Sequence, residues 1–150
     1  MSDFKLRTAR ESDMPAVLGL IQALATYEKA PDAVINTVEQ LTEDGFGNSK
    51  IFDCIVLEDK QEVIGFALYF TGYSTWKGKT LYLEDFLVDE RYRGQGLGQL
   101  LFDAVVDEAK RRNVKRMDWQ VLEWNEPALN FYKKNNAGLD PEWVNGRLYF

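Results

Sequence analysis

The middle of the chain carries a strand, a glycine-rich loop and an amphipathic helix in one continuous pattern. Residues 80–88 form an apolar run that contains two carboxylates, and Arg93-Gly94-Gln95-Gly96-Leu97-Gly98 follows shortly after it. Apolar residues then recur at helical spacing: Leu97, Leu100, Leu101, Ala104, Val105 and Ala109. A strand that leads through a short loop into such a helix is typical of domains that combine helices with a sheet.

The flanking sequence predicts the element order β, α, α, β, β, β, α, β, α, β. Strands are expected over residues 4–9, 51–57, 62–70, 80–88, 116–122 and 147–150. Helices are expected after Ser12 or Asp13, from Thr37 to about Asp44, from Leu97, and over residues 127–135. The polar turn at residues 58–61 predicts a hairpin. The chain is therefore expected to be an α/β (or α+β) protein with a mixed sheet, in one domain over residues 1–150.

The absence of histidine and the presence of only one cysteine limit the chemistry open to this chain. Ser-His-Asp and Cys-His mechanisms and imidazole zinc sites are excluded. Cys54 cannot form a disulfide within the chain, and in its strand it is expected to be a small buried apolar side chain. Acid–base catalysis is left to carboxylates, tyrosine, lysine or water. No metal site is expected.

The charge balance indicates which partners the chain prefers. The net charge is −6, which disfavours nucleic acid and anionic membrane surfaces and favours a small cationic substrate. No apolar run approaches the length of a membrane span, and the first residues do not look like a signal peptide. We therefore expect a cytoplasmic protein with no nucleic-acid or membrane partner.

The glycine-rich loop is the strongest candidate for a ligand site. Glycines permit positive φ and a close approach of a ligand, and the N–H groups at a helix N-terminus bind phosphate. The dinucleotide fingerprint would need glycine at position 99, which is Gln99, and no G-K-[ST] phosphate loop is present. The pattern that fits is R-x-x-G-x-G. A glycine-rich turn without a ligand is the alternative.

This loop resembles the pyrophosphate-binding turn of the GNAT acetyltransferases, and four further blocks resemble their diamine (spermidine/spermine) acetyltransferase family. The blocks are residues 43–47, 73–86, 123–127 and 130–133. The Tyr-Ser-Thr-Trp-Lys-Gly form at 73–78 is similar to the family's thialysine acetyltransferase-like branch, whereas polyamine enzymes carry an acid at Ser74. The resemblance implies a GNAT fold with a mixed, mostly antiparallel sheet flanked by about four helices. It also implies acetyl-CoA as co-substrate and a homodimer.

The resemblance also assigns roles to individual residues. Tyr132 would be the general acid for the CoA thiolate, and Glu84 would be a base through water or a binder of the amine. Cofactor contacts would come from Phe86, Leu87, Val88, Arg93, Gly94, Gln95, Gly96, Leu97, Gly98, Gln99, Asn125, Glu126, Pro127, Ala128 and Tyr132. Acceptor contacts would come from Tyr27, Glu28, Trp76, Glu84, Asp85, Asp118, Trp119 and Gln120.

The residues alone also allow plainer interpretations of these positions. Asn125 is equally suited to cap a helix, and Tyr132 and the acceptor aromatics could be packed side chains. Glu84 and Asp85 are neighbours on a strand, so their side chains are expected on opposite faces of the sheet.

The expected reaction is direct transfer of the acetyl group to a primary amine of a small cationic acceptor: a thialysine- or lysine-like amino acid, a diamine or a polyamine. Two alternatives remain open. The chain could acetylate protein lysines or N-termini, or it could be a non-catalytic acetyl-CoA-binding regulator. The tail from Ala137 departs from the family's acidic segment, which leaves the acceptor and dimer contacts of that region open.

Overall fold

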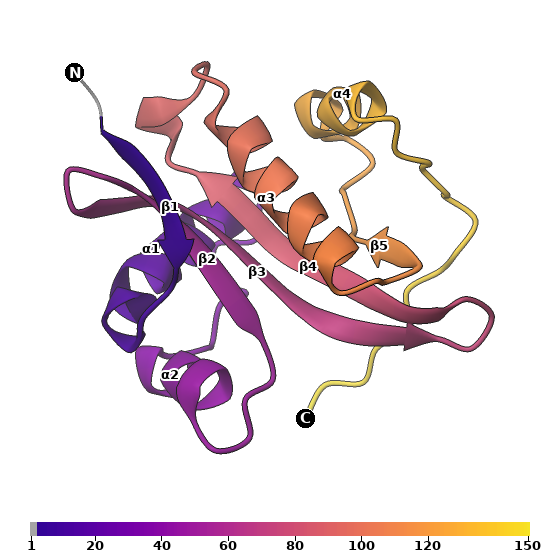
Figure 1. The fold of residues 1–150 in the computed structure, drawn as a ribbon, viewed down its shortest axis with the longest axis horizontal. Helices are drawn as coiled ribbons and strands as arrows, with labels where there is room; N and C mark the ends of the chain where they lie inside the picture. Colours follow the sequence, from indigo (N-terminus) through magenta and orange to yellow (C-terminus); the bar gives the residue numbers. More distant parts are fainter. Residues whose placement is uncertain (1–2) are drawn as a thin grey trace. The chain divides into compact units, whose positions relative to one another are not determined.

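The structure, a computed structural model, describes residues 3–150 and contains one five-stranded sheet in the order β1-β2-β3-β4-β5 (Figure 1). Its strands are β1 (Phe4–Thr8), β2 (Asp53–Asp59), β3 (Glu62–Ser74), β4 (Gly78–Val88) and β5 (Arg116–Asp118). Its α-helices over these residues are α1 (Met14–Tyr27), α2 (Val38–Phe46), α3 (Leu97–Arg111) and α4 (Glu126–Lys134). Short 3-10 turns cover Glu11–Asp13 and Glu90–Tyr92.

Two compact units divide the chain. The first extends up to Trp119 and holds the sheet with α1, α2 and α3, and the second is Gln120–Phe150 and holds α4. Neighbouring strands from β1 to β4 pair antiparallel, and β5 pairs parallel with β4. The predicted fold class, a mixed and mostly antiparallel sheet with four helices, is confirmed.

The two faces of the sheet are covered by different helices. On one face a core cluster joins Met14 and Val17 of α1 and Leu41 of α2 to Val56 and Phe66 of the strands. On the other face, Phe102 of α3 packs its ring 5.8 Å from that of Phe86, and the Arg112 guanidinium lies 5.3 Å from the Tyr69 ring. Even-numbered β3 residues such as Phe66 and Leu68 therefore face α1 and α2, and Tyr69 faces α3.

The helix starts follow the sequence signals, with one difference. Thr37 caps α2 by accepting a hydrogen bond from the Gln40 N–H at 3.1 Å. Asp13 occupies the cap position of α1, but its carboxylate accepts from the Arg7 guanidinium at 2.7 Å and from the Arg10 N–H. Hydrogen bonds from Arg7 lower the pKa of Asp13. Asp13 therefore ties β1 to the start of α1.

Two strand predictions are wrong. The strand expected over residues 116–122 ends at Asp118, because its ladder with β4 holds only three residue pairs, the last of them Tyr82 with Asp118. Residues 147–150 form no strand, because no neighbouring strand supplies hydrogen-bond partners for this segment among the described residues. No helix of the described part is long and apolar enough to cross a membrane.

Candidate active site

The loop between β4 and α3 presents backbone N–H groups around an open space. Gly94 and Gly96 adopt φ values of 79° and 78°, a left-handed conformation that side chains other than glycine's rarely tolerate. Gly96 is the N-cap of α3 and offers no side-chain oxygen to the first N–H groups of the helix. A Cβ at either glycine would meet no heavy atom within 4 Å. The loop therefore fits an anionic group such as a pyrophosphate.

Arg93 stands at the start of this loop. Its Nε donates to the Val88 carbonyl oxygen at 3.5 Å, and its guanidinium lies 5.8 Å from the centroid of the Tyr27 ring. No carboxylate of residues 3–150 forms an ion pair with it. The loop thus carries a cation that forms no ion pair among these residues, although its charge helps to lower the pKa of Asp89.

The strand before the loop leaves its parallel neighbour part-way along its length. The ladder between β4 and β5 ends at Tyr82 and Asp118, whereas β4 continues to Val88. The side chain of Phe86 packs on Phe102, and Leu87 joins the core cluster on the opposite face. An extended ligand arm that approaches the glycine loop would run along this part of β4.

A β-bulge at Glu84 interrupts the regular pairing of β4 with β3. Leu83 lies opposite Tyr69 and Asp85 lies opposite Leu68, so Glu84 is the extra residue of β4. Leu83 therefore shares the α3 face with Tyr69, and Asp85 shares the α1 and α2 face with Leu68. The strict alternation from which opposite faces were predicted for Glu84 and Asp85 is interrupted here, so their placement stays a prediction.

Three carboxylates interact around the bulge. Burial, together with repulsion from Glu84 and from Glu28, which caps the C-terminal end of α1, raises the pKa of Asp85 to about 7. Burial also raises the pKa of Glu28. No hydrogen bond or ion pair of residues 3–150 reaches the Asp85 carboxyl. The Asp85 carboxyl is therefore suited to bind a cation or to accept and release a proton.

The family model of the acetyltransferases (GNAT) matches residues 18–137, which include the glycine loop, the bulge and α4. The chain belongs to this family. As a GNAT acetyltransferase it is an enzyme that uses acetyl-CoA.

Curated relatives and solved structures agree with this assignment. The chain is 38% identical to a thialysine N-epsilon-acetyltransferase of Bos taurus, over 91% of this chain and 85% of the relative. It is 36% identical to a spermidine/spermine N(1)-acetyltransferase-like protein 1 of Homo sapiens, over 91% of this chain and 21% of the relative. An aminoglycoside N-acetyltransferase in complex with CoA shares the fold with a TM-score of 0.78 at 15% identity, covering 99% of this chain and 96% of that one.

The other predicted acceptor residues of this GNAT enzyme in the first unit have contacts of their own. Trp76 is 82% exposed in the turn between β3 and β4, roughly 20 Å along the strand from Glu84. Asp118 forms an ion pair with Arg116 at 2.7 Å. Trp119 packs edge-on against Phe102 of α3 at 5.5 Å. The structure brings together Glu28, Glu84 and Asp85, and it does not bring Trp76 to them.

The second unit contains the remaining predicted residues. Asn125 caps α4 by accepting from the Ala128 N–H at 3.3 Å, with Glu126 and Pro127 in the first turn, so its capping interpretation is confirmed. Tyr132 of α4 is 7% exposed, and its ring contacts Phe131 at 5.5 Å. The Gln120 side-chain amide donates to Asn145.

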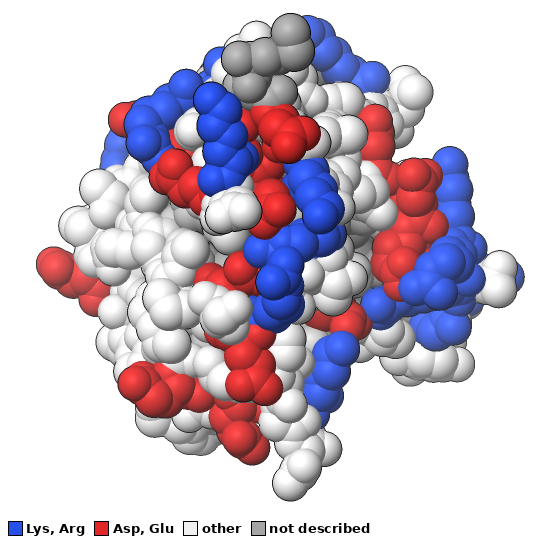
Figure 2. Space-filling model, turned by 60° about the vertical axis from the view of Figure 1, so that its left-hand side comes forward, with Lys and Arg blue, Asp and Glu red and all other residues white. Residues whose placement is uncertain are grey.

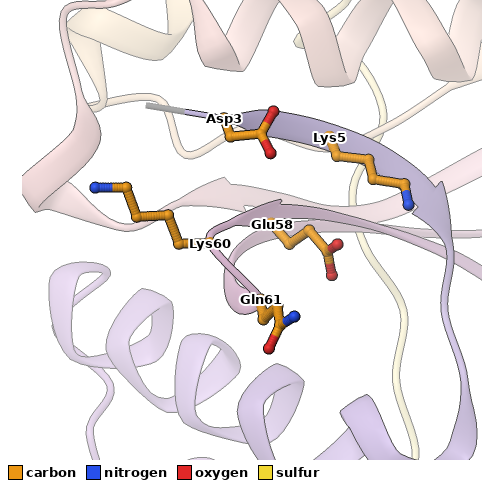
Figure 3. A pocket seen from close by; sticks show the side chains of 5 residues that line it. All are labelled: Asp3, Lys5, Glu58, Lys60 and Gln61. Carbon is orange, nitrogen blue, oxygen red and sulfur yellow. The ribbon is translucent and has the colours of Figure 1, made fainter. Parts of the chain in front are cut away.

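A separate pocket of about 400 Å³ lies at the edge of the sheet (Figure 3). Asp3, Lys5, Glu58, Lys60 and Gln61 line it, and none of them is a predicted site residue. On the face shown in Figure 2, basic and acidic side chains lie next to one another, without a wide basic surface. The glycine loop and the three carboxylates therefore remain the candidate functional site.

Proposed function

We propose that this enzyme transfers the acetyl group of acetyl-CoA directly to a primary amine of a small cationic acceptor. The observation that carries the proposal is the group formed by Glu28, Glu84 and Asp85. Glu84 and Asp85 belong to β4, the strand that leads into the glycine loop. The similarity to a thialysine N-epsilon-acetyltransferase and to a spermidine/spermine N(1)-acetyltransferase-like protein supports it. Like charges that lie close together favour a ligand that supplies the missing positive charge.

The chain must also remove a proton from the bound amine. An alkylamine with a pKa of about 10.4 is almost entirely protonated at pH 7, and only the neutral amine attacks a thioester. Glu84, directly or through water, accepts the first proton and passes it to solvent. A backbone N–H at Phe86 or Leu87 polarises the acetyl carbonyl. Tyr132 donates a proton to the departing thiolate, and the second amine proton replaces it when the amide forms.

The acceptor class follows from charges that this chain lacks. Ser74, where polyamine enzymes of the family carry an acid, accepts hydrogen bonds from the N–H groups of Trp76 and Lys77 at 3.3 and 3.1 Å, which is a turn-stabilising role. With no carboxylate at position 74, the second cationic centre of a long polyamine gains less electrostatic stabilisation when it binds. Lysine-like amino acids and short diamines are therefore proposed ahead of spermidine.

A thiol-release assay with purified enzyme tests this proposal. Acetyl-CoA is supplied with thialysine, lysine, ornithine, spermidine or a pool of lysine-containing peptides, and CoA release is followed. Release with the small amines, fastest with the lysine-like ones, is expected. Release with peptides alone would favour protein acetylation. Tight acetyl-CoA binding without release for any amine would favour a regulator and contradict the proposal.

The role of Tyr132 has its own test. Tyr132→Phe removes the acidic proton and keeps the ring, so kcat is expected to fall about 100-fold with little change in KM for either substrate. Full activity of this variant would contradict the general-acid role. A circular dichroism spectrum that matches the wild type shows that the loss is chemical.

We further propose that residues 1–150 act as one domain in a cytoplasmic homodimer. The family model supports one domain because it spans residues of both compact units. The single cysteine, Cys54, is buried and forms no disulfide, which suits a reducing compartment.

A further inference from the structure

The C-terminal end of α1 meets the glycine loop, although the two lie far apart in the sequence. The Arg93 guanidinium lies over the ring of Tyr27, the last residue of α1, with 5.8 Å between the guanidinium carbon and the ring centroid. This distance is within the range of a cation–π interaction. Tyr27 is 43% exposed, so the contact lies at the surface where a ligand can reach it.

Arg93 is held in place without being neutralised. Its Nε donates to the Val88 carbonyl oxygen, and no hydrogen bond of residues 3–150 uses its terminal Nη atoms. Arg91, two residues earlier, differs in this respect, because Asp89 and Glu62 pair with its guanidinium at 2.9 and 3.0 Å. The Arg93 contacts therefore fix the stem and the plane of the guanidinium and leave its terminal donors for an anion.

We propose that Tyr27 is a positioning residue for acetyl-CoA: its ring holds the Arg93 guanidinium in place for the pyrophosphate. This inference rests on the proposed function of the loop, and it moves the main role of Tyr27 from the amine acceptor to the cofactor. The neighbouring Glu28 remains with the acceptor carboxylates. At the C-terminal end of α1, Tyr27 thus contributes to the acetyl-CoA site and the adjacent Glu28 to the amine site.

The physical basis is pre-organisation. A free arginine side chain loses rotamer entropy when it binds phosphate, and a side chain already held by a ring and a carbonyl loses less. Loss of the ring is therefore expected to weaken CoA binding by about threefold to tenfold. The benefit belongs to the ring face and not to the hydroxyl, so phenylalanine should retain it.

Calorimetric titration of CoA into four proteins tests the proposal: the wild type, Tyr27→Phe, Tyr27→Leu and Tyr92→Leu. Tyr92→Leu is the matched control, because its ring lies 5.6 Å from the Arg91 guanidinium and also packs on Phe4. Tyr27→Leu is expected to weaken binding, whereas Tyr27→Phe and Tyr92→Leu should match the wild type. Equal binding by Tyr27→Leu, or weakening by Tyr27→Phe as large as that by Tyr27→Leu, would overturn the proposal.

A double-mutant cycle separates positioning from a general effect on the fold. In an Arg93→Ala background, Tyr27→Leu should have no further effect on CoA affinity. In steady-state assays, Tyr27→Leu should raise KM for acetyl-CoA and leave kcat and KM for the amine within twofold. A raised KM for the amine with an unchanged KM for acetyl-CoA would return Tyr27 to the acceptor site.

The wild-type titration separates a failure of the proposed function from a failure of the role of Tyr27. If the wild type binds no CoA, the proposed function and this inference both fail. If the wild type binds CoA and all variants bind equally, only the role of Tyr27 fails. If CoA binds and the Tyr27 effects appear but no amine is acetylated, the positioning role stands and the acceptor proposal fails.

Discussion

Asp85 is the residue whose chemistry depends most on its surroundings. Burial and the nearby Glu84 and Glu28 raise its pKa to about 7, because the charged form loses hydration and meets like charges. Its carboxyl therefore changes from neutral to charged as the pH passes through about 7. A bound cation reverses this effect by favouring the carboxylate.

Asp85→Asn should make the protein more stable at high pH. The pKa is raised from 3.8 to about 7 on folding, so the wild type loses stability as pH rises between these values. The variant lacks this loss, and its free energy of unfolding at pH 8 should exceed that of the wild type by on the order of 2 kcal/mol, with no difference near pH 4. Urea unfolding at both pH values measures the effect.

Asp53→Asn is the control with the opposite sign. The hydrogen bonds from Lys50 and Arg112 outweigh burial and lower the pKa of Asp53, so this variant should be less stable than the wild type at pH 8. A stabilised Asp53→Asn, or an Asp85→Asn that shows no dependence on pH, would contradict the assignment of charges.

Sequence patterns identified the acidic residues but not their arrangement. Glu84 and Asp85 stood out as charges inside an apolar strand. Alternation predicted opposite faces of the sheet for them, but it gave no sign of the bulge that shifts the register between Leu83 and Asp85. The contact between Tyr27 and Arg93 had no sequence signal, since the residues lie on separate elements.

Among the elements, the loop and α3 follow most directly from local sequence. Glycines before an amphipathic run predicted a helix N-terminus, and α3 begins at Leu97 as expected. The glycines are nevertheless not equivalent. Gly96 has a positive φ, whereas Gly98 lies inside the first turn of the helix.

Gly96→Ala and Gly98→Ala should therefore have opposite effects on stability. Alanine at position 96 is strained in a left-handed conformation, which should cost about 1 kcal/mol. Alanine at position 98 meets no heavy atom within 4 Å and should stabilise α3 by up to about 1 kcal/mol. Thermal unfolding without ligand measures both. Equal shifts of Tm in the same direction would contradict this account of the loop.

Strand ends depend on partners, so they were predicted less well than helix starts. Residues 119–122, Trp-Gln-Val-Leu, are mostly apolar and continue the pattern of β5, yet the ladder with β4 stops at Asp118. The segment 147–150 has strand-like composition and no neighbouring strand among the described residues. A strand needs a partner for its backbone groups, whereas a helix supplies its own.

At the scale of the whole molecule, exposed apolar side chains of the C-terminal segment support the proposed homodimer. Val144 is 93% exposed and Tyr149 is 89% exposed, and Trp143 and Leu148 are also exposed. Contiguous exposed apolar residues often mark an interaction surface. The net charge of −6 does not prevent association, because charges of both signs lie close together on the face shown in Figure 2.

Sedimentation equilibrium should give about twice the chain mass of 17.3 kDa. Trp143→Ser combined with Tyr149→Ser should shift the protein toward the monomer, because it removes apolar area from the interface. Ile35→Ser, an exposed apolar position in the other unit, is the control and should leave the mass unchanged. A wild type that sediments as a monomer at all concentrations would contradict the homodimer.

The sequence by itself determined the order of the main elements, the glycine loop at the start of α3 and an acid–base chemistry without histidine. These features are local, because helix periodicity, glycine spacing and composition act over a few residues. Only the tertiary structure decided the bulge at Glu84, the raised pKa of Asp85 and the contact of Tyr27 with Arg93. Each of these depends on strand register and burial, which arise from contacts between residues distant in the chain.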